Sequence, residues 1–185
     1  MVKGKITAFP LMDKSVDELI KKNLNHAKTI IKNLDSFHPT MFLITSKALY
    51  YVTLDTDLAE KTQTSPNDQI YGLVRQFIEN EERLGEVLAY QVIGEAWMKS
   101  FRQGTDMTGL KHGDIAKMAN RIEVLTNVIV RKGMRRRFQT FEIIREEPEI
   151  EDSKVIEFKD FKLDSAESDK FPEIPKQISQ WSGKL

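Results

Sequence analysis

The 185-residue sequence contains no cysteine. This absence excludes disulfide frameworks, thiolate zinc sites, iron–sulfur clusters and cysteine nucleophiles. The chain also lacks an excess of charge of either sign, because 28 acidic side chains balance its 28 basic ones. A protein that coats nucleic acid or lies on an anionic membrane is usually basic overall, so the balance argues against both roles.

Long apolar runs are absent as well. No stretch approaches the roughly 18 apolar residues that a membrane-spanning helix needs. The basic residues near the start are not followed by the apolar run of a secretory signal. We therefore expect an intracellular protein of the cytoplasm. A composition of 40% hydrophobic and 30% charged residues is typical of a folded globular chain.

The hydrophobic pattern predicts two principal helices. Ser15 and Glu18 have the spacing of a capping box, and apolar residues then recur at helical spacing up to Leu34. A second helix is expected to start at Ser65, with proline in the first helical position. Gly85 would end it as a left-handed cap.

The remaining pattern predicts strands. Residues 40–55 are rich in β-branched and aromatic side chains and should form a hairpin that turns at Ser46 and Lys47. Further strands are expected over 87–101, 121–131 and 134–145, and a weaker one over 155–163. A turn at 132–134 would place Val128 opposite Phe138 and Leu125 opposite Phe141.

The predicted elements follow the order α-β-β-α-β-β-β-(β). Strands that run together without repeated βαβ alternation indicate an α+β domain. We expect a mainly antiparallel sheet of about five to six strands. The single domain would span residues 1–163, and residues 164–185 would form a C-terminal tail that wraps the body.

Glu95 is the first candidate for chemistry, because it shares a strand face with Ile93 and Trp97. A carboxylate between apolar neighbours could have a raised pKa and act as an acid or a base. The alternative is an ion pair with a cation on a neighbouring strand. We favour the ion pair, with Arg121 as the first candidate partner, over a role as metal ligand.

The long connection at residues 102–120 supplies the other catalytic candidates, which are Asp106, His112 and Asp114. Together with Glu95 they could serve a hydrolase as acid, base or metal ligands. The alternative is disorder, or a short helix over 115–119. The glycines of this loop fit neither a phosphate loop nor a dinucleotide fingerprint, and the histidines form no metal motif. The sequence therefore predicts no metal and no cofactor.

A basic run surrounds the predicted turn between the two long C-terminal strands. A hairpin of this kind can grip phosphates or enter a nucleic-acid groove. However, acidic residues follow closely at 146–152, and the local charges cancel. We therefore predict no strong binding to DNA or RNA. The candidate residues for nucleic-acid binding are Arg131, Lys132, Arg135, Arg136 and Arg137.

Two short motifs resemble a known pattern. The sequence Glu95-Ala96-Trp97 ends one predicted strand, and Arg121-Ile122-Glu123 begins the next. This arrangement is similar to one in uncharacterised bacterial and phage proteins, over the central third of the chain. The loop between the motifs departs from the Pro-Ser-rich loop of that pattern. The resemblance implies a small α+β domain and a phage or mobile-element origin, which would make association with a virion an alternative to the cytoplasm. It supplies no activity.

Both faces of the predicted sheet carry large apolar side chains. If the two helices cover one face, then the tail or a partner chain must cover the other, because monomers rarely expose so large an apolar patch. We therefore expect a homodimer that forms through the sheet or one of its edges. With no catalytic signature in the sequence, the favoured function is a non-catalytic, self-associating accessory or structural protein. The alternatives are the hydrolase and the nucleic-acid binder.

Overall fold

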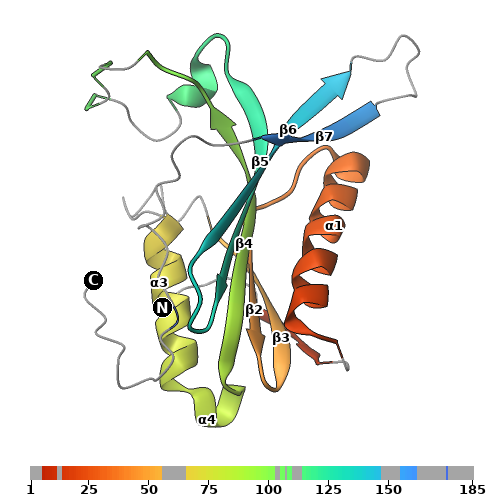
Figure 1. Ribbon diagram of the computed structural model, residues 1–185, viewed down its shortest axis with the longest axis vertical. Helices are drawn as coiled ribbons and strands as arrows, with labels where there is room; N and C mark the ends of the chain where they lie inside the picture. Colours follow the sequence, from red (N-terminus) through yellow and green to blue (C-terminus); the bar gives the residue numbers. More distant parts are fainter. Residues whose placement is uncertain are drawn as a thin grey trace.

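The structure is a computed structural model that describes residues 6–11, 14–55, 66–102, 105–106, 108–109, 114–146, 155–161 and 174 (Figure 1). Its strands form one seven-stranded antiparallel sheet in the order β1-β3-β2-β4-β5-β6-β7. The strands are β1 Ile6–Pro10, β2 Thr40–Thr45, β3 Ala48–Thr53, β4 Val87–Met98, β5 Ile122–Arg131, β6 Arg137–Glu146 and β7 Val155–Phe161. The helices are α1 Val16–Leu34, α3 Pro66–Glu79, α4 Glu81–Leu84 and the 3₁₀ turn η1 Ile115–Lys117.

The predicted α+β class with an antiparallel sheet is confirmed. The sheet has one strand more than the upper expectation, because β1 pairs with β3 at an edge of the sheet. All five residues of β1 are exposed. The strand therefore lacks the apolar and polar alternation that marks a half-buried strand in a sequence.

Helix α1 begins as the capping box predicts. The Ser15 hydroxyl accepts a hydrogen bond from Glu18 N at 3.3 Å, and the Glu18 carboxylate accepts one from Ser15 N at 2.8 Å. The helix ends at Asp35, which adopts the left-handed conformation with φ 67°. Its apolar face buries Leu19, Ile20, Ala27 and Ile31, whereas Leu34 in the last turn is 71% exposed.

Helix α3 starts at Pro66 and breaks at Asn80 before the short α4. The prediction of a left-handed cap at Gly85 is wrong in its detail. Gly85 has φ 91° and ψ 155°, so its backbone is extended with a positive φ. The reason for glycine is local crowding, since a Cβ on Gly85 would lie 2.9 Å from Lys47 N.

The two long helices lie on opposite faces of the sheet (Figure 1). Residues of α1 share a buried cluster with Phe42, Ile93 and Leu125 on one face. Residues of α3 share a second cluster with Leu43 and Val128 on the other. The premise that both helices cover one face is therefore wrong. Each apolar face has its own helix, and the molecule has three layers.

The predicted register of the β5–β6 hairpin is confirmed. Val128 pairs with Phe138, and Leu125 pairs with Phe141. The turn forms at Lys132 and Gly133, where Met134 N donates to Arg131 O at 3.1 Å. Strand β6 starts at Arg137, so the connection is longer than predicted.

Most of the predicted tail lies outside the described residues, including its aromatic anchors Phe171 and Trp181. Ile174 is described, and it is 3% exposed in the cluster beneath α3. Its carbonyl oxygen accepts a hydrogen bond from Gly133 N at 3.0 Å. In the described part of the chain, no helix has the length and apolar character that crossing a membrane requires.

Candidate functional site

Glu95 lies on β4, on the face of the sheet that α1 covers. It pairs with Leu125 of β5, and its side chain is 20% exposed. One carboxylate oxygen accepts a hydrogen bond from Phe37 N, in the segment that follows α1. The other oxygen lies 3.9 Å from Arg145 Nη2. The expected ion pair of Glu95 with a cation is therefore present, although at the long end of the range.

Arg145 of β6 is the centre of this site. Its Nε and Nη2 donate to the two carboxylate oxygens of Glu123 at 2.8 and 2.7 Å. Its Nη1 donates to Asp35 Oδ1 at 2.6 Å, at the end of α1. One guanidinium thus faces three carboxylates, and we call this group the Arg145 cluster: Asp35, Glu95, Glu123 and Arg145.

Arg121, the first predicted partner of Glu95, has a different contact. Its guanidinium lies over the Trp97 ring, 4.6 Å from the ring centroid, and donates to Met118 O at 3.1 Å. The choice of Arg121 is therefore wrong. Arg121 directly precedes β5, and its guanidinium is engaged by the Trp97 ring and the Met118 carbonyl.

The pKa of Glu95 is raised above its ordinary value. Burial is the main cause, and the Phe37 N–H opposes it by stabilising the ionised form. The Glu123 carboxylate raises the pKa further, and the Arg145 guanidinium lowers it. Burial and the neighbouring Glu123 carboxylate together outweigh the Phe37 N–H and the distant Arg145 guanidinium, so the site favours the protonated form of Glu95.

The polar groups of the Arg145 cluster bind mainly to one another and to the neighbouring backbone. The bidentate contact occupies both Glu123 oxygens, and the Phe37 N–H occupies one oxygen of Glu95. These contacts tie the end of α1 and the segment after it to β4, β5 and β6. Among the residues that the structure describes, no group of three or more His, Asp or Glu side chains is arranged to hold a metal ion. The arrangement is that of a polar clamp between α1 and the sheet.

The loop candidates do not join this cluster. Asp106 accepts hydrogen bonds from Thr108 N at 2.9 Å and Thr108 Oγ1 at 2.7 Å, and these bonds lower its pKa. Asp114 immediately precedes η1, which is the short helix expected in this loop. His112 lies outside the described residues. Within the described ranges, neither aspartate forms a hydrogen bond with Glu95.

Two members of the basic run form ion pairs within the described part of the chain. Arg131 Nη1 lies 2.7 Å from Asp17 Oδ1 of α1, and Lys132 Nζ lies 2.7 Å from Glu86 Oε1. Arg135 and Arg137 are exposed, and Arg136 is half-buried. Most of the acidic stretch that should mask them, residues 147–152, lies outside the described part of the chain.

A buried row of amides was not predicted. Gln91 is fully buried on β4 and accepts from Asn23 Nδ2 of α1 at 3.1 Å. Gln91 Nε2 donates to Asn127 Oδ1 on β5 at 2.9 Å and to Ile20 O at 3.1 Å. Asn127 Nδ2 continues the row to Gln139 Oε1 on β6 at 2.8 Å. The sequence signal of this row is an amide side chain at an otherwise apolar position of a helix or strand.

The two edges of the sheet differ in chemistry. Strand β1 has five exposed residues and no charged side chain, and its Ile6 and Phe9 are each 48% exposed. Strand β7 has exposed charged residues along its length: Glu157, Lys159 and Asp160. Charged side chains on an edge strand oppose pairing with another chain, whereas an uncharged edge permits it. Strand β1 lacks this charge, although its last residue, Pro10, has no N–H to donate.

Comparison of the chain with protein-family models, with curated proteins and with solved structures gives no significant match.

Proposed function

We propose that the protein is a non-catalytic, self-associating protein that pairs through β1. The observation that carries this proposal is the uncharged, exposed edge strand Ile6–Pro10. An edge strand presents a row of backbone N–H and C=O groups, and a second strand can satisfy them without any special side chain. Pairing through β1 does not require an uncovered sheet face, and each face of the sheet has a helix.

A two-fold axis is the simplest geometry for this pairing. Antiparallel contact between β1 of one copy and β1 of the other uses the same surface twice and closes the assembly as a dimer. The two seven-stranded sheets would then form one continuous sheet. Ile6 and Phe9 would lose exposed area on pairing, which adds a hydrophobic contribution to the backbone hydrogen bonds.

The contacts of the Arg145 cluster support a non-catalytic role over the hydrolase. Its carboxylates are occupied by the Arg145 guanidinium and by a backbone N–H, and Asp106 accepts a hydrogen bond from Thr108. The ion pairs of Arg131 and Lys132 weaken the nucleic-acid alternative in the same way. As part of the proposal, we infer an accessory or structural component of a phage or mobile element, acting in the cytoplasm or in the virion.

Light scattering coupled to size-exclusion chromatography tests the pairing. We expect a mass near twice that of the 21.4 kDa chain at micromolar concentration. Ala8→Lys places one charge at the middle of β1, where Ala8 is exposed, and should shift the mass to that of one chain. The matched control is Val155→Lys on β7, where Val155 is 45% exposed, and it should leave the dimer intact.

Three results would contradict the proposal. A single-chain mass for the native protein at about 100 μM excludes any dimer of useful affinity. Dissociation by Val155→Lys but not by Ala8→Lys assigns the interface to the other edge. Submicromolar binding of DNA or RNA near physiological salt, lost when Arg135 and Arg137 become glutamine, would instead support the nucleic-acid alternative.

A further inference from the structure

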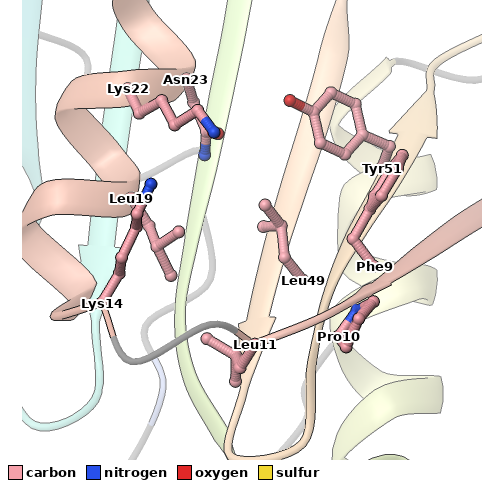
Figure 2. A pocket seen from close by; sticks show the side chains of 9 residues that line it. All are labelled: Phe9, Pro10, Leu11, Lys14, Leu19, Lys22, Asn23, Leu49 and Tyr51. Atoms are coloured by element: carbon pink, nitrogen blue, oxygen red, sulfur yellow. The ribbon is translucent and has the colours of Figure 1, made fainter.

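A pocket of about 310 Å³ lies between the first half of α1 and the strands β1 and β3 (Figure 2). Leu19, Lys22 and Asn23 line it from the helix, and Leu49 and Tyr51 line it from β3. We call it the α1–β1 pocket. Its volume is at the small end of the range for ligand sites, which suits a molecule of about ten non-hydrogen atoms.

Most of the pocket wall is apolar. Leu49 and Leu11 point into the space between the helix and the strands in Figure 2. Phe9 and Tyr51 form one side, with ring centroids 5.4 Å apart in an edge-to-face arrangement. The apolar side chains that line the pocket are Phe9, Pro10, Leu11, Leu19, Leu49 and Tyr51. Such a wall favours a hydrocarbon chain over a polar or highly hydrated ligand.

The polar groups of the pocket are mostly cationic or neutral donors. Lys14 and Lys22 are exposed at the rim. Lys22 has no hydrogen-bond or ion-pair partner among the described residues, whereas the charge of Lys14 acts on Glu18. Burial raises the pKa of the Tyr51 hydroxyl, so this group stays a neutral donor. In Figure 2 the hydroxyl is directed toward the end of the pocket where Lys22 lies.

Asn23 does not contribute to anion binding. It is 2% exposed, and its Nδ2 donates to Gln91 at 3.1 Å. One Nδ2 hydrogen is therefore used within the core, and the Oδ1 acceptor beside it would repel a carboxylate. The groups that can bind an anion are consequently Lys22 and Tyr51 at one end and Lys14 at the rim.

We propose that the α1–β1 pocket binds a small aliphatic carboxylate. The carboxylate would accept hydrogen bonds from the Lys22 ammonium and the Tyr51 hydroxyl, and the chain would lie against Leu11 and Leu49. Charge complementarity selects the anion, and the apolar wall selects the chain. The proposal goes beyond self-association, because the pocket is lined by α1 and shares only the side chains of Phe9 and Pro10 with β1, not the backbone groups of the β1 edge.

Titration of the full-length protein with octanoate tests the proposal. Amide and side-chain chemical shifts in NMR spectra report both the affinity and the location. We expect shifts at Leu11, Leu49 and the Asn23 side chain, with a dissociation constant of about 0.1–1 mM for ten non-hydrogen atoms. Octylammonium has the same chain with the opposite charge, and should bind at least about 10-fold more weakly. Acetate, with the head group alone, should not produce measurable shifts.

Three variants locate the binding groups. Lys22→Glu should weaken octanoate binding at least about 10-fold, because it reverses the charge at the carboxylate end. Tyr51→Phe should weaken it about 3- to 10-fold through loss of one donor. Lys21→Glu is the matched control: it makes the same charge change on the adjacent exposed residue of α1, which does not line the pocket. It should change the affinity less than about 2-fold.

Each opposite result would overturn the proposal. Absence of shifts with about 10 mM octanoate means that the pocket does not take the ligand. Equal binding of octylammonium means that the lysines do not select the anion. Equal weakening by Lys21→Glu and Lys22→Glu means that binding depends on overall charge. Binding to anionic vesicles without octanoate binding would assign the lysines to a membrane surface. The circular dichroism spectra of the variants must match that of the native protein.

Discussion

Arg145 on β6 donates two hydrogen bonds to Glu123 on β5, at 2.8 and 2.7 Å, and so joins neighbouring strands through a planar, bidentate contact. The Glu123 side chain is 14% exposed and that of Arg145 30%. Bidentate contacts of this kind are stronger than single hydrogen bonds and fix geometry. The third donor of the same guanidinium reaches Asp35, so one side chain also holds the end of α1 to the sheet.

The first prediction follows from this contact. Arg145→Met removes the cation and leaves the half-buried carboxylates of Glu95 and Glu123 without it. We expect the free energy of unfolding in urea to fall by about 1–3 kcal/mol, less than for a fully buried pair because Arg145 is partly exposed. The control is Arg75→Met, which breaks an exposed pair with Glu79 on α3 and should cost under about 0.5 kcal/mol. Equal losses in the two variants would contradict the clamp.

The second prediction concerns the raised pKa of Glu95. A carboxyl group whose pKa is higher in the folded state binds more protons there than in the unfolded state. The native state therefore loses stability as the pH rises from the ordinary value of 4.5 through the folded pKa. Glu95→Gln mimics the protonated form and keeps an acceptor for Phe37 N. We expect its stability relative to the native protein to rise over this pH window.

Urea unfolding at several pH values on both sides of the ordinary value of 4.5 measures this difference and covers the lower window of the control below. Glu18→Gln is a control of opposite sign. The Ser15 backbone and hydroxyl lower the pKa of Glu18, so its ionised form stabilises the helix start, and the variant should lose stability above the ordinary pKa. A Glu95→Gln variant whose relative stability is independent of pH would show that Glu95 titrates normally.

Local patterns predicted much of the fold because they depend on neighbouring residues. The Ser15–Glu18 capping box is a contact within one turn, and the pairing of Val128 with Phe138 follows from turn length and alternation. The layers could not be predicted in this way. Whether α3 covers the same face as α1 depends on how the chain crosses the sheet, and both faces of β4 and β5 are apolar enough for either arrangement.

The candidate site, too, could be predicted from the sequence only in part. Alternation correctly placed Glu95 on an apolar face, and the tendency of such carboxylates to pair predicted a cation. It could not choose between Arg121 and Arg145, because both arginines lie near the same end of the sheet and have long side chains. The packing of Arg121 on Trp97 decided the choice, and that contact depends on the tertiary structure.

The third prediction uses two glycines that differ in their surroundings. Gly85 has a positive φ, and a Cβ there would lie 2.9 Å from the backbone nitrogen of Lys47. Gly85→Ala should therefore reduce the free energy of unfolding by about 1–3 kcal/mol. Gly72 lies inside α3, and a Cβ there meets no atom within 4 Å. Gly72→Ala should stabilise the protein by about 0.5–1 kcal/mol through helix propensity. Thermal unfolding of both variants measures the signs, and equal signs would contradict the local geometry.

The last prediction concerns the amide row beneath α1. Gln91→Met keeps the length of the side chain but removes its hydrogen bonds to Asn23 and Asn127, which are 2% and 0% exposed. Buried amide groups without partners cost about 1–3 kcal/mol each, so we expect a loss of about 2–4 kcal/mol in urea unfolding.

A triple variant separates the cost of unpaired groups from the value of the row itself. Asn23→Leu and Asn127→Leu, added to Gln91→Met, remove the stranded amides and replace them with apolar side chains. Because the buried partners now leave together, and Gln139 at the end of the row is only half-buried, most of the lost stability should return. Loss that simply adds over the three substitutions would show that each amide stabilises the fold independently. Recovery would show that the row contributes little net stability, so that its effect is to fix how α1, β4 and β5 pack.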